Sequence, residues 1–152
     1  MSARGGGWVV AQFALIALVM LAVVIPPDWP SDVQGVLSAM GVALAIAGAA
    51  VAVWSARALG RALTPFPKPV AGAGLVDSGP YAVVRHPVYA GGILFFTGWS
   101  LYAGPVALLL TAALAVLWAA KTAVEERHLR EAHPAYADYA SRVRWRIVPG
   151  LY

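Results

Sequence analysis

The sequence predicts an all-α integral membrane protein with about four membrane-spanning helices. Hydrophobic residues make up 61% of the 152 residues and charged residues only 12%, a balance that soluble domains do not show. The apolar residues form four long runs, and the basic residues lie near the ends of these runs. A chain of this length suits one domain, so residues 1–152 are expected to form a single membrane-embedded unit.

The first apolar run covers residues 8–25, contains no charged residue and is long enough to cross a bilayer. Trp8 and Trp29 flank it, as aromatic residues commonly do at a membrane interface. Because Arg4 precedes the run, a cleaved signal peptide is the alternative, although the run is long and no clear small-residue cleavage site follows it. The sequence favours a membrane span here and leaves its retention open.

The second run covers residues 33–58 and would extend about 39 Å as a helix, at 1.5 Å per residue. Two series of small residues repeat every four positions along it: Gly41, Ala45 and Ala49, and Gly48, Ala52 and Ala56. Small residues at this spacing let helices approach closely in lipid, and packing alone is the favoured interpretation of these positions.

The third and fourth runs cover residues 88–103 and 106–124 and are separated only by Gly104-Pro105. Glycine followed by proline marks a turn, so the two runs are expected to form a tight helical hairpin with a short third helix. Trp118 and Lys121 mark the cytoplasmic end of the fourth run, where Lys121 is expected to extend its ammonium group toward water.

Two segments outside the spans are expected to lie at one membrane face. Residues 59–87 form a long loop rich in proline and glycine, which we interpret as a lid or a pocket wall. In the tail, residues 125–152, the fourth helix is expected to leave the bilayer at Glu125 and to break at Pro134, with a short helix after it.

The distribution of charge predicts the orientation. All eleven lysine and arginine residues lie in the N-terminal segment, in residues 57–87 or in residues 121–152, whereas the turn at residues 26–32 carries only Asp28 and Asp32. With four spans, every basic segment falls on one side, as the positive-inside rule requires. We therefore expect a multi-pass protein of the cell (inner) membrane with both termini cytoplasmic.

Composition also excludes several kinds of site. There is no cysteine, so the chain has no disulfide, no thiolate nucleophile and no cysteine metal ligand. The three histidines, His86, His128 and His133, lack metal-ligand spacing, and no metal is expected. The net charge of +4 does not indicate nucleic acid, because the basic residues lie beside apolar runs and suit contact with membrane lipid. Nothing in the sequence indicates an oligomeric state.

A polar cluster at residues 79–92 interrupts this apolar chain just before the third run. It contains, in order, Tyr81, Arg85, His86, Pro87, Tyr89, Gly91 and Gly92. Pro87 disfavours a helical conformation at His86 and suits the first turn of a helix. The cluster is therefore expected at a helix N-terminus, where unpaired backbone N–H groups favour anions. A turn in which Arg85 faces lipid phosphate is the alternative interpretation.

The motif Arg85-His86-Pro87-x-Tyr89-x-Gly91, following Gly79-Pro80-Tyr81, resembles the isoprenylcysteine carboxyl methyltransferase and phospholipid methyltransferase family of integral membrane enzymes. Further matches are Leu59-Gly60, the pair Glu125-Glu126 and the ending from Arg142 to Tyr152. Each motif is weak alone, but their order and spacing over roughly residues 40–152 resemble a short, bacterial-type member.

The resemblance implies methyl transfer from S-adenosyl-L-methionine to a lipophilic acceptor, either an isoprenylcysteine-type carboxylate or another lipid-like carboxylate, amine or thiol. The residues expected to bind the cofactor are Tyr81, Arg85, His86, Pro87, Tyr89, Gly91, Glu125 and Glu126. Those expected to act in catalysis are Arg85, His86, Tyr89 and Glu126. Those expected to meet the acceptor are Tyr136, Tyr139, Arg142, Arg144 and Arg146, and the three arginines also suit anionic lipid headgroups.

The residues themselves do not decide which glutamate of the pair faces the pocket. The family resemblance alone favours Glu126. Adjacent helix positions diverge by about 100°, so the other glutamate is expected to face water.

A second class of membrane enzyme has a related motif. NADPH-dependent sterol and steroid reductases are similar in the histidine–proline–tyrosine motif and in the ending, but they typically carry asparagine where this chain has Val88 and an acid where it has Gly92. The chain is also short for that group. Such a reductase is the alternative.

The orientation can be tested by cysteine labelling, because the native chain contains no cysteine. A cysteine introduced beside Asp28 should react with a membrane-impermeant reagent from outside the cell, and one near Ser141 only after the membrane is opened. Labelling of the site near Ser141 in intact cells would contradict the predicted orientation.

Overall fold

The computed structural model describes residues 5–26 and 28–151, and these residues form helices without any strand. The α-helices are α1 (Gly6–Leu21), α2 (Ser31–Leu59), α3 (Pro87–Ala103), α4 (Pro105–Ala132) and α5 (Tyr136–Arg142). Short 3-10 helices cover Ala22–Val24, Gly60–Ala62 and Gly79–Ala82. The predicted all-α fold is confirmed.

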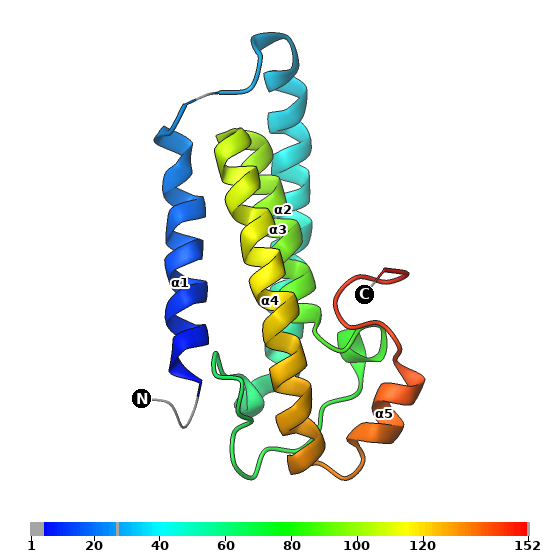
Figure 1. Cartoon of the computed structure of the whole chain (residues 1–152). Coiled ribbons are helices and arrows are strands. Elements are labelled where there is room, and N and C mark those ends of the chain that lie inside the picture. Colours follow the sequence, from blue (N-terminus) through cyan, green and yellow to red (C-terminus); the bar gives the residue numbers. More distant parts are fainter. Residues whose placement is uncertain (1–4, 27, 152) are drawn as a thin grey trace.

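The four long helices run alongside one another as an elongated bundle (Figure 1). The turn between α1 and α2 and the turn between α3 and α4 lie at one end, whereas the loop after α2 and helix α5 lie at the other. Three helical segments, Gly6–Val24, Ser31–Ala62 and Pro105–Ala132, are long and apolar enough to cross a membrane. Helix α3 has 17 residues and is shorter, so a fourth span stays a prediction.

The hairpin between α3 and α4 turns at a single residue. Gly104 ends α3 with φ of 127°, a conformation that residues with a Cβ atom disfavour, and Pro105 opens α4 at the next position. Helix α4 then continues without a break through Glu125 to Ala132, two residues before Pro134. The expected tight hairpin and the expected break at Pro134 are therefore both present.

Helices α2 and α3 approach until their backbones touch. A methyl group added at Gly91 would lie 2.8 Å from the carbonyl oxygen of Gly48 and 2.5 Å from the backbone nitrogen of Ala52. At Gly41, an added methyl group would lie 2.5 Å from the carbonyl oxygen of Gly98. The interpretation of the small residues on α2 as packing positions is thus confirmed, and α3 supplies the matching glycines.

Helix α1 is held against the other side of the bundle. Its residue Val19 is fully buried in a core cluster with Phe96 of α3 and with Leu114 and Trp118 of α4. The indole N–H of Trp99 also donates to the carbonyl oxygen of Val19 at 3.0 Å. Helix α1 is therefore an integral wall of the bundle.

Replacing Gly48 by alanine should separate α2 from α3, because the added methyl group would meet the backbone of Gly91 and Phe95, which cannot rotate away. We expect a loss of about 1–3 kcal/mol in the free energy of unfolding, measured in detergent micelles. Gly35→Ala is the matched control on the same helix, since its added methyl group meets nothing within 4 Å. It should leave stability unchanged or raise it by up to about 1 kcal/mol. Equal stability of the two variants would contradict the packing described.

Candidate active site

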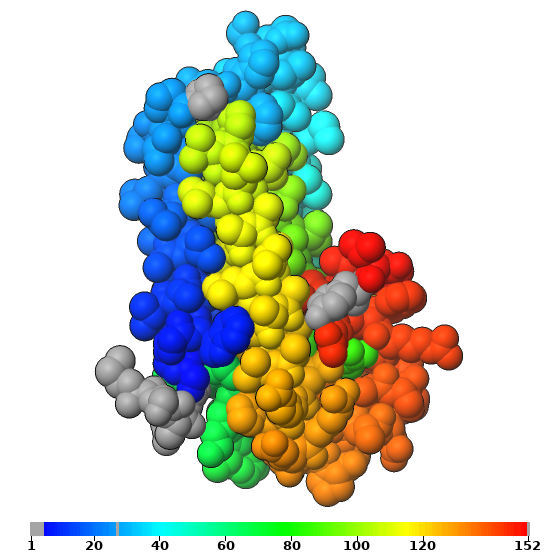
Figure 2. All heavy atoms as spheres, in the orientation of Figure 1, coloured from blue at the N-terminus to red at the C-terminus, as the bar shows by residue number. Residues whose placement is uncertain are grey.

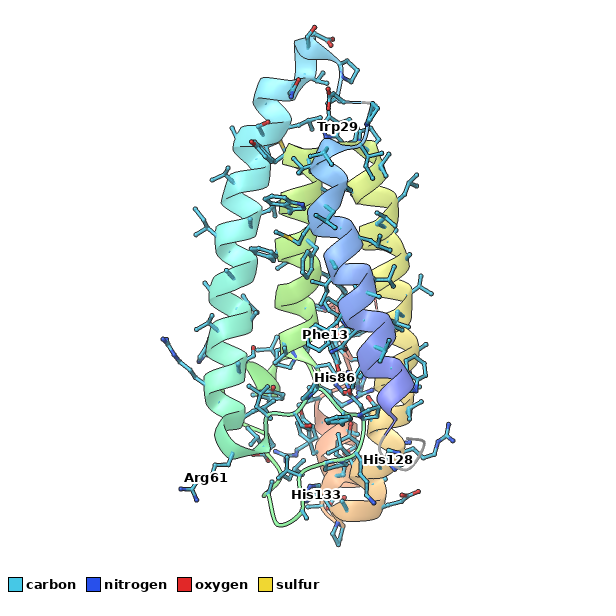
Figure 3. All side chains as sticks on the ribbon, turned by 90° about the vertical axis from the view of Figure 1, so that its left-hand side faces the viewer. Phe13, Trp29, Arg61, His86, His128 and His133 are labelled. Carbon is cyan, nitrogen blue, oxygen red and sulfur yellow. The ribbon has the colours of Figure 1, made fainter. Side chains whose placement is uncertain are left out.

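A cavity of about 520 Å³ opens within the bundle at the end that carries the loop. Its wall is mostly apolar and comes from all four long helices, the loop and α5. Helices α1 and α2 contribute Gln12, Phe13, Ala52 and Leu59, and the loop contributes many of residues 62–76. The remaining wall residues are Tyr81, Arg85, His86, Val88, Tyr89, Gly92, Trp118, Lys121, Glu125, Leu129, His133, Tyr136 and Tyr139. Figure 3 shows Phe13 and His86 in the loop-bearing half of the bundle, with Trp29 at the opposite end.

The polar motif reaches the cavity because α3 begins at Pro87. His86 lies immediately before that helix, as predicted, and Tyr89 falls in its first turn. The tail pairs with this stretch through two backbone hydrogen bonds, from Arg85 N to Trp145 O (2.9 Å) and from His86 N to Arg146 O (2.7 Å). Figure 2 shows the C-terminal segment packed against the loop-bearing half of the bundle. No sequence pattern indicates this contact, since it uses only main-chain atoms.

The guanidinium of Arg85 forms hydrogen bonds with other groups of the protein. Its Nε donates to Oε1 of Glu126 at 2.8 Å, and one terminal nitrogen donates to the carbonyl oxygens of Val143 (2.8 Å) and Arg144 (2.7 Å). The side chain is only 8% exposed. Arg85 therefore ties the tail to α4 in addition to lining the cavity.

Glu126 lies behind the cavity wall. Its carboxylate is 1% exposed, and besides Arg85 it is close to Nε of Arg146 (3.2 Å) and Nε2 of His86 (3.5 Å). The expectation that one glutamate of the pair faces water is wrong, because the tail folds back over this face of α4. Glu126, which the resemblance favoured at the pocket, is not among the residues of the wall.

Glu125 is the glutamate that lines the cavity. Its Oε1 accepts a hydrogen bond from the hydroxyl of Tyr89 at 2.6 Å, and its Oε2 lies 3.5 Å from Nδ1 of His86. The side chain is 13% exposed, so this carboxylate is both held in place and open to the cavity. The arrangement can bind a cation or a pair of hydroxyl groups.

The prediction that Lys121 extends its ammonium group toward water is wrong. It is fully buried, with Nζ 2.8 Å from Oε1 of Gln12 and 2.7 Å from the carbonyl oxygen of Pro65. The loop covers this position, so the ammonium finds its partners inside the protein. A signal was present in the sequence, since Gln12 and Lys121 are polar residues within apolar runs, where such residues commonly pair.

The residues expected to meet the acceptor divide into two groups. Tyr136 and Tyr139 are buried and line the cavity, and the Tyr139 hydroxyl donates to the carbonyl oxygen of Tyr81 at 2.8 Å. Burial raises the pKa of Tyr81, Tyr136 and Tyr139 above the usual tyrosine value, so all three phenols stay neutral. The expected arginines lie apart: Arg142 pairs with Asp77 at 3.1 Å on the surface, Arg144 is exposed, and Arg146 turns inward to Glu126.

Besides Glu126, two residues expected to bind the cofactor lie outside the cavity wall. Pro87 is buried at the start of α3, and neither it nor Gly91 is among the wall residues. The space beside Gly91 is filled by the backbone of α2. The structure therefore brings Tyr81, Arg85, His86, Tyr89 and Glu125 together around the cavity. Within residues 5–26 and 28–151, no group of three or more histidine, aspartate or glutamate residues is arranged to hold a metal.

A family model described as "Phospholipid methyltransferase" matches residues 36–135, from the second turn of α2 to the residue before α5. The "Cobalt-zinc-cadmium resistance protein CzcN" of Cupriavidus metallidurans is 32% identical over 143 residues, which cover 91% of this chain. The chain spans 61% of the length of that curated relative.

Replacing Arg85 by alanine should release the tail from α4, because it removes one charged hydrogen bond to Glu126 and two to tail carbonyl groups. One hydrogen bond to a charged group is worth about 1.5–3 kcal/mol. We expect faster amide hydrogen exchange at residues 143–147, measured by mass spectrometry in detergent. Arg144→Ala is the control, since that side chain is exposed, and should leave exchange unchanged. Unchanged exchange in Arg85→Ala would show that Arg85 does not hold the tail.

Proposed function

The chain belongs to the phospholipid methyltransferase family, and from this premise we propose that it transfers a methyl group from S-adenosylmethionine to a lipophilic acceptor. The observation that supports the proposal most directly is the cavity, which sets the carboxylate of Glu125 and the ring of His86 against a mostly apolar wall. A polar cofactor and an apolar acceptor need both kinds of surface in one place.

The donors and acceptors of the wall suit the cofactor. When bound, S-adenosylmethionine supplies a methyl group already activated on a sulfonium sulfur, so the protein supplies binding, orientation and electrostatics. Glu125 is placed to accept from an ammonium or from ribose hydroxyl groups, and His86 lies beside it. Tyr81, Tyr139 and Leu75 offer an aromatic and apolar slot for a purine ring. Arg85 supports this site through the tail rather than as a free cation.

The acceptor is proposed to enter from the bilayer. The small residues of α2 and α3 leave no gap for it, because the backbones of those helices touch. Phe13 of α1 lines the cavity and is 54% exposed, and Ala52 of α2 lines the same cavity. We therefore place the apolar entrance between α1 and α2, with the polar entrance under the loop.

Protonation requirements depend on the acceptor. An ionised carboxylate or thiolate can attack the methyl group without a base, whereas a protonated amine has to lose a proton first. Glu125 is the carboxylate placed to take that proton within the described wall. On the surface, exposed Arg144 and Trp145 suit contact with an anionic headgroup. The basic end of the bundle, with the cavity, is proposed to face the cytoplasm at the inner membrane.

Calorimetry with S-adenosylhomocysteine on the protein in nanodiscs tests the cofactor. We expect binding, and Glu125→Gln should weaken it about tenfold or more by removing a charged partner. Glu131→Gln, at an exposed position near the end of the same helix, should bind as the native protein does. A methyl-transfer assay then compares carboxylates, amines and thiols of increasing chain length. Turnover should rise with length, as partitioning gains about 0.8 kcal/mol per methylene.

Two results would contradict the proposal. Binding of NADPH without binding of S-adenosylhomocysteine would favour the reductase alternative. A short, water-soluble acceptor turned over as well as its long-chain relatives would exclude entry from the bilayer.

A further inference from the structure

We propose that Lys121 is a positioning residue of this cavity, which holds Glu125 and the covering loop in place without touching the ligands. The inference rests on the proposed function, because it concerns the carboxylate assigned there to the cofactor.

The contacts of Lys121 show that its hydrogens are all used within the protein. The side chain is fully buried, and Nζ faces Oε1 of Gln12 (2.8 Å), the carbonyl oxygen of Pro65 (2.7 Å) and Oε1 of Glu125 (3.4 Å). All three partners are acceptors, and only the protonated ammonium has three N–H donors to meet them. Lys121 is therefore a buried cation that faces the carboxylate of Glu125 and two neutral acceptors.

One consequence concerns the rotation of the Glu125 carboxylate. Its Oε1 receives the hydroxyl of Tyr89 at 2.6 Å and lies next to the ammonium of Lys121. Two donors on one oxygen fix the carboxylate and leave Oε2 on the side of His86, 3.5 Å from Nδ1. Oε2 is then the oxygen that a bound cation or hydroxyl meets.

The second consequence concerns the loop over the cavity. Pro65 lies in a stretch whose residues line the cavity, and its carbonyl group is bound by Lys121 of α4. The same ammonium holds Gln12 of α1. One buried charge thus joins the loop, α1 and α4, all of which form the cavity wall. Losing it should free the loop and the carboxylate together.

The test combines Lys121→Met with Glu125→Gln in a double-mutant cycle. Lys121→Met alone should weaken S-adenosylhomocysteine binding about tenfold, the scale of one hydrogen bond, and should speed hydrogen exchange at residues 62–67 in the ligand-free protein. In the Glu125→Gln background it should lower the affinity by less than in the native protein and should still free the loop, because part of the lysine's effect on the ligand passes through Glu125. Lys68→Met, an exposed lysine on the same loop, is the control and should change neither quantity.

Native affinity and native loop exchange in Lys121→Met would overturn the proposal. Losses of affinity that add fully across the cycle would also overturn it, since they would show that Lys121 does not act through Glu125. If Lys121→Met does not fold, Gln12→Leu removes one acceptor and keeps the lysine; it should shift both readouts in the same direction by less, and no shift would overturn the proposal. If the native protein fails to bind S-adenosylhomocysteine, the proposed function fails, and loop exchange still decides whether Lys121 holds the loop.

Discussion

The candidate site depends on the ion pair between Arg85 and Glu126. Two opposite charges, both nearly buried, join the segment just before α3 to the last two turns of α4, with Nε of Arg85 2.8 Å from Oε1 of Glu126. The same guanidinium binds two carbonyl groups of the tail. Removing Glu126 would leave the buried guanidinium of Arg85 with carbonyl groups as its protein partners, and loss of one charge of a buried pair costs more than the pair itself contributes. Removing Arg85 would leave Glu126 with Arg146 and Arg130 as its charged partners. The pair therefore fixes where the tail runs, and the tail in turn covers this face of α4 and binds the backbone of His86.

The bundle itself was largely predictable. Runs of apolar residues, Gly104-Pro105 and Pro134 mark helices and their ends through local rules of backbone geometry, and the structure follows them closely. Tyr81, Arg85, His86, Tyr89 and Glu125 also meet around one cavity, whereas Glu126 lies behind its wall. The sequence places these residues near each other because the start of α3 and the last turns of α4 stand at the same end of adjacent helices.

What could not be predicted depends on contacts between distant segments. Adjacent positions on a helix point in different directions, but which of Glu125 and Glu126 faces a cavity depends on what covers the helix. The tail covers it here, held by main-chain hydrogen bonds and by Arg146 against Glu126. The burial of Lys121 likewise depends on the path of the loop past Pro65. In the resulting site, Arg85 pairs with Glu126 and Lys121 lies beside Glu125. The carboxylate of Glu125 can therefore face a mostly apolar cavity while the neighbouring charges stay paired.

The contact between α2 and α3 has a mechanical consequence. Their glycines bring main chain against main chain, where there are no side chains to change rotamer and absorb a shift. The two helices are thus expected to move as one rigid body. If the cavity widens to admit a bulky molecule, the movement has to come from α1 or from the loop after α2. These parts of the wall are held to the bundle by side chains, which can change conformation.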